Sequence, residues 1–407
     1  MNFFLIIFLT VSSFLPKASS YEVSVLIVDP GDEIFSKFGH SALMVKRPDG
    51  YKKVYDFGNF IMDKKFIRDF IHGEAFYSLS VRSFDSFYDS YVGEERTIRR
   101  HKLNLTPEQA ANVYSILEAT YNSSERYYLY DHFRDNCATR IRDVISRATK
   151  GELREVMEKS KALSWRINLD RILGSSFLVK YGLKLILSSI MDSSRNSWDG
   201  AFLPLLLEEE LLRSRIRLDP FGSSVPLVVN SEIIFKGKDH NGELKIPLWL
   251  YPILILFLFL IFAPFFYRDD PLFLKISVIL VSSIVLILFG IMLFMHFHHG
   301  ICSYNLNLIG FFPLLSIVLL WMVFKTPYDR IGKFFIAAMF FPLFQIFIRI
   351  FTIQKTFPFP ESVLFFYILI FIQWKISLRK PSRDKSDVES AEKKEENKPL
   401  QQEISSS

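Results

Sequence analysis

The segment 127–143 of this 407-residue chain is the most informative one about the fold of its first half. It reads Tyr127-Tyr-Leu-Tyr-Asp-His-Phe-Arg-Asp-Asn-Cys-Ala-Thr-Arg-Ile-Arg-Asp143. It places Cys137 directly after an asparagine that can cap a helix. From there apolar residues recur at the spacing of one helix face and stop before Gly151, at Ile141, Val144, Ile145 and Ala148. We therefore expect a helix that begins at the cysteine.

A cysteine in the first turn of a helix has a specific chemical environment. Unpaired backbone N–H groups and the positive end of the helix dipole stabilise a thiolate there, which favours Cys137 as a nucleophile. The alternative is a small buried cysteine that fills a gap in the core, because free cysteines are among the most buried residues. The local pattern alone leaves both interpretations open.

A histidine upstream supplies a possible partner. The segment Phe38–Val45 reads as a turn followed by a strand that begins at or just after His40, and Val54–Gly58 reads as its hairpin partner. A histidine that opens a strand and a cysteine that opens a helix are the two halves of a thiol–imidazole pair. Without the cysteine, a histidine at a strand start would more often be a rim or core residue.

The third member of a catalytic triad is predicted on the same hairpin. Asp56 would orient the imidazole by accepting a hydrogen bond from its second N–H group. Tyr55 is the fallback, although regular alternation places it on the opposite face of the strand. The Cys137 backbone N–H and the Asn136 side chain are candidate oxyanion donors, but Asn136 can equally be only a helix cap.

Three short motifs together resemble a known family. Gly39–Val45, Val54–Gly58 and Asp135–Asp143 look like the signature of the Lnb-type bacterial lipoprotein N-acyltransferases. The histidine precedes the cysteine, the reverse of papain, as in the circularly permuted papain-like groups that include NlpC/P60 proteins and lecithin:retinol acyltransferase. The resemblance implies an α+β, circularly permuted papain-like cysteine-enzyme domain.

Composition and targeting signals fit an enzyme outside the cytoplasm. Residues 1–20 resemble a signal peptide, so we expect 21–245 to form a periplasmic domain. This part of the chain is close to neutral, although the whole chain carries a net charge of +6, and nucleic-acid binding is not suggested.

Thr106 and Gln109 predict a capping box at the start of another helix.

The second half changes to long apolar stretches after Pro247. Five of them are close to the length of a membrane span, at 248–267, 272–295, 306–324, 333–352 and 361–376. We expect residues 246–377 to be an all-α bundle of about five transmembrane helices. The distribution of Lys and Arg predicts a multi-pass protein of the bacterial inner membrane with its C-terminus in the cytoplasm. Residues 378–407 are predicted to be a disordered cytoplasmic tail.

Polar residues also lie between the predicted second and third spans. His299, Asn305 and Asn307 resemble a pattern in the membrane half of the suspected family and are candidate substrate-binding residues, although they can instead make helix–helix hydrogen bonds. The series His296, His298, His299 and Cys302 lacks a second cluster, so no metal is expected. A Cys137–Cys302 disulfide is formally possible but would remove the nucleophile. The apolar segment Leu163–Leu212 is either part of the ordinary core or a helix that lies on the membrane surface.

The predicted activity is acyl transfer by a thioester route. Cys137 would attack a phospholipid ester with His40 as the base, and an amine would then take the acyl chain as an amide. The family resemblance supplies the acceptor, the N-terminal cysteine amine of an apolipoprotein. No cofactor is expected. Two alternatives remain, a cysteine amidase or peptidase that acts on the cell wall and a membrane scaffold without enzymatic activity.

Overall fold

The protein divides into two compact units. The computed structural model describes residues 20–174, 177–218, 222–240, 250–266, 271–310, 331–352 and a few positions between 364 and 375. The predicted signal peptide, apart from its last residue, and the predicted tail lie outside them. The first unit comprises Met1–Lys245, Phe294–Asn305 and Ile353–Lys355, and the second comprises Ile246–Leu293, Leu306–Thr352 and Thr356–Ser407.

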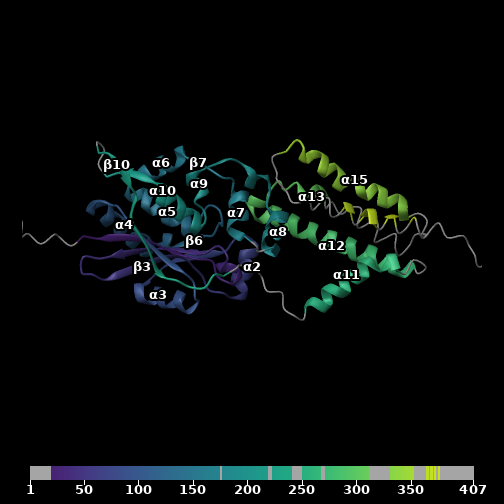
Figure 1. Ribbon diagram of the computed structural model, residues 1–407, viewed down its shortest axis with the longest axis horizontal. Coiled ribbons are helices and arrows are strands. Elements are labelled where there is room, and N and C mark those ends of the chain that lie inside the picture. The colour runs from purple at the N-terminus through teal and green to yellow at the C-terminus, as the bar shows by residue number, and fades with distance from the viewer. Residues whose placement is uncertain are drawn as a thin grey trace, which may run out of the picture. The chain divides into compact units, whose positions relative to one another are not determined.

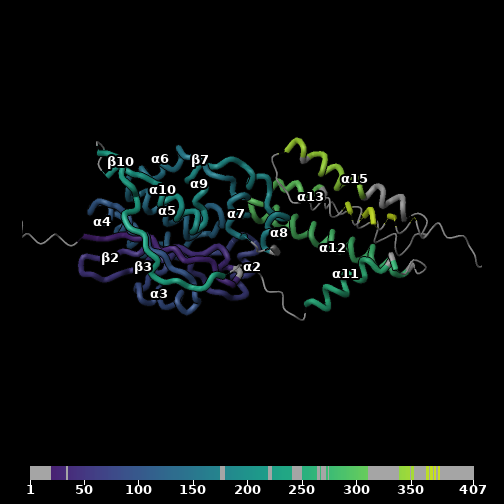
Figure 2. Tube along the Cα trace, in the orientation of Figure 1, coloured from purple at the N-terminus to yellow at the C-terminus, as the bar shows by residue number. Residues whose placement is uncertain are grey.

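A seven-stranded antiparallel sheet is the frame of the first unit (Figure 1). Its spatial order is β11-β5-β1-β2-β3-β4-β6. Figure 2 shows that β11, which comes late in the chain, lies beside the early strands. The strands are β1 (Glu22–Val28), β2 (His40–Lys46), β3 (Lys52–Asn59), β4 (Phe76–Ser83), β5 (Ile98–Leu103), β6 (Tyr127–Leu129) and β11 (Val228–Phe235). Two small sheets pair β7 (Lys161–Ala162) with β8 (Arg195–Asn196) and β9 (Arg215–Arg217) with β10 (Ser224–Pro226).

Helices cover both faces of the large sheet because its central strands carry consecutive apolar residues, whose side chains point alternately to the two faces. On one face, Leu43 and Tyr55 pack in a core with helices α4 and α5. On the other face, Met44 and Val54 pack against α3. The helices of this unit are α2 (Lys64–Ile71), α3 (Phe84–Gly93), α4 (Pro107–Tyr121), α5 (Cys137–Ala148), α6 (Glu152–Lys159), α7 (Trp165–Leu173), α8 (Phe177–Ile186), α9 (Ser197–Gly200) and α10 (Pro204–Arg213).

A third apolar cluster joins distant parts of the first unit. It brings together Trp165 and Leu169 of α7, Phe133 before α5, Phe202 before α10, and Cys302. The structure therefore favours the interpretation that much of the apolar segment 163–212 is part of the ordinary core. The segment Phe294–Asn305, which comprises the end of α12 (Pro271–His298) and the residues after it, also belongs to the first unit.

The second unit corrects the predicted bundle of about five transmembrane helices. Among the described residues only Lys275–His298, within α12 (Pro271–His298), is long and apolar enough to cross a bilayer. A span needs about 20 apolar residues, whereas the apolar helical stretches Leu250–Ala263 of α11 (Leu250–Phe266) and Met339–Ile348 of α15 (Ile331–Arg349) are shorter.

The other two predicted spans contribute little described structure. Segment 306–324 contains only the short α13 (Asn307–Gly310) among its described residues, and most of 361–376 lies outside them. A long apolar stretch therefore does not always form one long helix. Pro342 inside α15 shows how an apolar run can contain a residue that cannot donate the backbone hydrogen bond of a regular helix. The α+β class of the first unit agrees with the prediction; the five-helix bundle does not.

Candidate active site

Asn136 fixes the start of the helix that carries Cys137. Its Oδ1 accepts hydrogen bonds from the backbone N–H groups of Ala138 and Thr139 at 2.9 and 3.1 Å, and Thr139 Oγ1 accepts one from Asn136 N at 2.8 Å. This capping box makes Cys137 the first residue of α5. The capping box uses the backbone N–H groups of Ala138 and Thr139 but not that of Cys137. The Cys137 N–H group is therefore available to donate to an oxyanion.

The amide nitrogen of Asn136 is also fully engaged. Its two hydrogens go to the backbone carbonyls of His132 at 2.6 Å and Phe202 at 2.9 Å, and the residue is buried. An Asn side chain has only two N–H donors. The structure therefore favours the helix-cap interpretation of Asn136 over a role as oxyanion donor.

His40 and Asp56 meet on neighbouring strands. His40 is the first residue of β2, and its Nε2–H donates to Asp56 Oδ1 of β3 at 2.5 Å. Arg82 of β4 donates from Nη2 to the other oxygen of this carboxylate at 2.8 Å. Asp56 is 7% exposed, so both of its partners act on a carboxylate that water scarcely reaches. Because Asp56 occupies Nε2, the nitrogen of His40 left for the thiol is Nδ1.

Burial and charge oppose each other at the pair. Burial alone raises the pKa of the Cys137 thiol, but the His40 charge, a hydrogen bond to His40 and hydrogen bonds to Ser41 bring that pKa below its ordinary value. Burial lowers the pKa of His40, but Tyr91, Asp56 and Cys137 raise it well above its ordinary value. The pair therefore favours a thiolate beside an imidazolium, the reactive form of a cysteine nucleophile.

The same balance keeps Asp56 ionised. Burial raises the pKa of this carboxyl, but the charges of His40 and Arg82 and their hydrogen bonds bring it below its ordinary value. Arg82 in turn lies over the rings of Phe87 and Tyr91, at 4.7 and 5.6 Å from their centroids. The cation is thus held in place from outside the triad.

Gly58 leaves room for the imidazole to approach the thiol. It lies in β3 at an irregularity of the pairing with β4, with a φ of +104°. A Cβ at this position would lie 3.5 Å from His40 Cε1 and 3.9 Å from Cys137 Cβ. The backbone conformation is one that glycine adopts readily and other residues rarely do. Gly58 therefore marks the meeting point of β2, β3 and α5.

Two further residues at the site were missed by the sequence reasoning. Arg82 lies two residues from Ser80, the partner of Asp56 across the β3–β4 pair, so its place beside Asp56 follows from the strand register and not from a local sequence pattern. The Ser41 hydroxyl is buried with no oxygen or nitrogen partner among the described residues, yet it helps lower the pKa of the Cys137 thiol. No local pattern distinguishes Ser41 from any other serine in a strand.

The other predicted site residues lie elsewhere. Tyr55 points into the core on the opposite face, where its hydroxyl donates to Glu118. His299 Nε2 bonds the carbonyl of Ile71 at 2.9 Å, and Asn305 Nδ2 donates to the carbonyl of Leu185 at 2.7 Å. Asn307 is in the second unit and accepts from Gln345 at 3.0 Å. None of these three hydrogen bonds involves Cys137 or His40.

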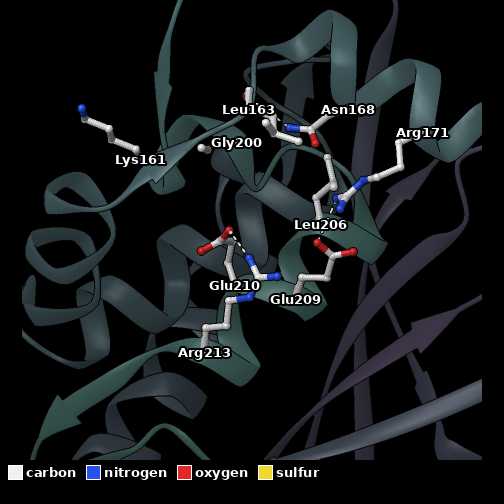
Figure 3. Close-up of a pocket in the computed structure, with 10 residues that line it drawn as sticks. Lys161, Leu163, Asn168, Arg171, Gly200, Leu206, Glu209, Glu210 and Arg213 are labelled. Carbon is white, nitrogen blue, oxygen red and sulfur yellow. Dashed lines mark hydrogen bonds and ion pairs between the residues drawn. The ribbon is translucent and has the colours of Figure 1, made fainter.

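The described residues contain no group of three or more His, Cys, Asp or Glu side chains that could hold a metal ion. Both cysteines are free. A hollow of about 240 Å³ near α7 and α10 contains none of the predicted site residues. Two ion pairs, Arg171–Glu209 at 2.9 Å and Arg213–Glu210 at 3.7 Å, lie in its wall (Figure 3). Four of its charged groups are thus paired with each other, whereas Lys161 takes no part in these two pairs.

Comparison with known proteins agrees with the motifs. Residues 16–171 match the Lnb N-terminal periplasmic domain. No curated protein and no solved structure matches the chain. The matched segment contains His40, Asp56, Arg82 and Cys137, and it supports a periplasmic location for the first unit. Over these residues the match supports the Lnb-type lipoprotein N-acyltransferase family.

Proposed function

We propose that the protein transfers an acyl chain from a phospholipid to the N-terminal cysteine amine of an apolipoprotein. The observation that carries this proposal is the partly buried series Arg82–Asp56–His40–Cys137, which ends in a thiol of lowered pKa at the start of a helix. Such a thiol is a nucleophile for acyl carbonyls. The family match supports the choice of lipid and lipoprotein as substrates.

The first half-reaction forms a thioester. The Cys137 thiolate attacks the ester carbonyl of the phospholipid, and the Cys137 backbone N–H stabilises the oxyanion. The carbon–oxygen bond then breaks, and the imidazolium of His40 gives its proton to the departing glycerol oxygen. A lysophospholipid leaves, and the acyl chain remains on Cys137 while His40 is neutral.

The second half-reaction forms an amide. The amine nitrogen attacks the thioester carbonyl, and neutral His40 accepts a proton from that nitrogen. The carbon–sulfur bond breaks, and the thiolate–imidazolium pair is restored. Asp56 keeps the imidazole oriented throughout, and Arg82 keeps Asp56 ionised. Neither half-reaction leaves an unbalanced proton or electron pair.

The test uses the full-length protein with a phospholipid and no acceptor. Intact-mass spectrometry should find one acyl group on the wild-type protein and on Cys302→Ser, and none on Cys137→Ser. Addition of a lipopeptide with a free N-terminal cysteine amine should move the acyl group to that amine. An acyl group on Cys137→Ser, or release of cell-wall fragments without any acyl adduct, would contradict the proposal; the second result would favour a cell-wall amidase or peptidase.

A further inference from the structure

A cavity of about 230 Å³ lies in the first unit beside the stretch that leads into α5. Tyr130 and His132 line it from that stretch, Phe70 from α2, Leu129 from β6, and the segment 298–301 from the end of α12 and the loop after it. All of its lining residues belong to the first unit. The cavity is thus a feature of the catalytic unit.

The lining of the cavity suits an uncharged, aliphatic ligand. Phe70, Leu129, Phe133 and Ile301 supply apolar wall, and no Lys or Arg lines it. Its one carboxylate, Asp131, already accepts from two backbone N–H groups that follow it in the chain. A phosphate would need cations or several free N–H donors. The cavity therefore fits an acyl chain better than a lipid headgroup.

The imidazole of His132, one of three in the wall with those of His298 and His299, is consistent with this chemistry. Burial lowers the pKa of His132 to about 4, so the ring is neutral at pH 7. Its Nδ1 pairs with the Tyr130 hydroxyl at 2.9 Å, and its Nε2 is buried without a partner among the described residues. Neutral aromatic rings, those of Phe38 and Phe133 among them, pack around it. No positive charge from His132 is available to hold a phosphate.

The cavity and the nucleophile share Tyr130. Its ring stacks on Tyr77 at 4.2 Å between centroids. Burial raises the pKa of Tyr130 most, and the charge of Cys137 raises it further, as it does for Tyr77. The residue before Cys137, Asn136, donates from its side chain to the carbonyl of His132 at 2.6 Å, so the cavity wall lies next to the start of α5. An acyl chain in the cavity would therefore extend away from a carbonyl placed at Cys137.

The cavity is also lined by the last residue of the one candidate membrane span among the described residues. That span ends at His298, which lines the cavity, and the next residue bonds the carbonyl of Ile71 at the end of α2. Ile67 and Ile71 lie one turn apart on α2, and both are exposed. The ester of a bilayer lipid lies near the boundary where a span ends. A chain drawn from the bilayer would meet apolar surface here.

We propose that this cavity, lined by Tyr130, His132, Phe70, Leu129 and the segment 298–301, receives the acyl chain that Cys137 takes from the lipid donor. The proposal rests on the acyl-transfer function proposed above and names the part of the molecule that holds the chain. It predicts that filling the cavity discriminates against long acyl chains without changing the reactivity of the thiol.

Two substitutions fill the cavity from different walls. Gly300→Leu adds a side chain where a Cβ meets open space and where the backbone is not left-handed, so no strain is expected. Gly93→Leu is its control, because Gly93 also has open space and ends α3, away from the cavity. Leu129→Trp enlarges a cavity residue that is 48% exposed, and Leu212→Trp is a control on α10 that is 47% exposed.

Each full-length variant is tested in detergent with three reagents: iodoacetamide, the acetyl ester and the hexadecanoyl ester of p-nitrophenol. Both cavity variants should acylate at least tenfold more slowly with the hexadecanoyl ester. Their rates with the acetyl ester and iodoacetamide should stay within twofold of wild type. The two controls should match wild type with all three reagents.

The outcomes separate this proposal from the proposed function. If both cavity variants keep the wild-type ratio of hexadecanoyl to acetyl rates, the cavity does not hold the chain, although acyl transfer by Cys137 stands. If wild type itself forms no acyl adduct with either ester, the function fails and this proposal fails with it. If Gly300→Leu does not fold, Leu129→Trp alone decides the matter by the same ratio.

Discussion

Cys137 and Cys302 are two copies of one side chain in one unit of the molecule, and their surroundings give them opposite chemistry. Cys302 lies in an apolar cluster at 1% exposure, and burial raises its pKa to about 12. Cys137 is also largely enclosed, yet its pKa falls below the ordinary value because His40 and Ser41 face the sulfur. Burial of a thiol therefore does not decide its reactivity; the polar groups that share the enclosure do.

The largest expected effect is the difference between the two cysteine variants. Cys137→Ala should lower acyl transfer by about 10³-fold or more, because the covalent step is lost. Cys302→Ala should leave the rate unchanged and lower the free energy of unfolding by about 1 kcal/mol, the value of one buried carbon-sized group. Transfer is measured by mass spectrometry and stability by denaturant unfolding. Equal loss of activity in both variants would contradict the comparison.

The second prediction concerns the pH dependence of Cys137. In wild type, alkylation by iodoacetamide should reach half its maximum below the ordinary pKa of a thiol, because the His40 charge favours the thiolate. His40→Ala removes that charge and leaves burial, so the midpoint should move to higher pH. Acyl transfer by wild type should fall again at high pH, once His40 loses the proton that the leaving group needs.

The matched measurement is the alkylation of Cys302 in the unfolded protein and in the native protein. Native Cys302 should react slowly at every pH up to 9 in both wild type and His40→Ala. A midpoint for Cys137 that does not move in His40→Ala would show that the imidazole does not set the reactivity of the thiol.

Sequence patterns predicted those parts of the site that depend on local structure. Asn136 as the residue before a helix start, His40 at a strand start, and the capping box of Thr106 with Gln109 are all present in the structure. Each depends on residues within a few positions of one another, where helix caps and strand alternation act. The proximity of His40 and Asp56 could also be predicted from the sequence, because a hairpin places its two strands side by side.

What the sequence did not reveal depends on register and on helix length. Arg82 reaches Asp56 only because β4 pairs with β3 in one register, and Ser41 faces the thiol only because α5 packs on that face of β2. The prediction of a bundle of about five spans failed for a related reason, although one predicted span, 272–295, overlaps the candidate span Lys275–His298. Apolar composition reports that a stretch avoids water, but it does not report where a helix begins and ends.

The third prediction tests how far the difference between the cysteines depends on Arg82. Arg82→Gln removes the cation from Asp56, so the pKa of Asp56 should rise, the imidazolium should lose support, and the alkylation midpoint of Cys137 should move to higher pH. Hydrogen bonds to charged groups contribute about 1.5–3 kcal/mol, which corresponds to about 10- to 100-fold in transfer rate. Arg82→Lys should restore part of the rate, because it keeps the charge.

Arg100→Gln is the control for Arg82. Arg100 is also 27% exposed in its side chain and also pairs with a carboxylate, Glu232, but that pair lies between β5 and β11. Its removal should leave the alkylation midpoint of Cys137 in place. If Arg100→Gln and Arg82→Gln shift the midpoint equally, the effect comes from the overall charge of the sheet rather than from Asp56.

The smallest expected effect belongs to Ser41. Its hydroxyl is buried and has no oxygen or nitrogen partner among the described residues, so Ser41→Ala leaves no protein donor or acceptor of those kinds unpaired. Thermal or denaturant unfolding should therefore change little, since a lost buried group that had no partner carries no hydrogen-bond cost. The thiolate, however, loses the weak support of this hydroxyl, for which we take the lower range of a hydrogen bond, about 0.5–1.5 kcal/mol. Transfer should slow by roughly 2- to 10-fold.

The direction of the pH shift makes this prediction specific. Because Ser41 favours the charged sulfur, its removal should move the alkylation midpoint of Cys137 to higher pH while Cys302 stays unreactive. Ser24→Ala, at another buried serine of the same sheet, should change neither quantity. If Ser41→Ala lowers stability but leaves the midpoint in place, the hydroxyl serves the packing of β2 against α5, and the lowered pKa of Cys137 belongs to His40 alone.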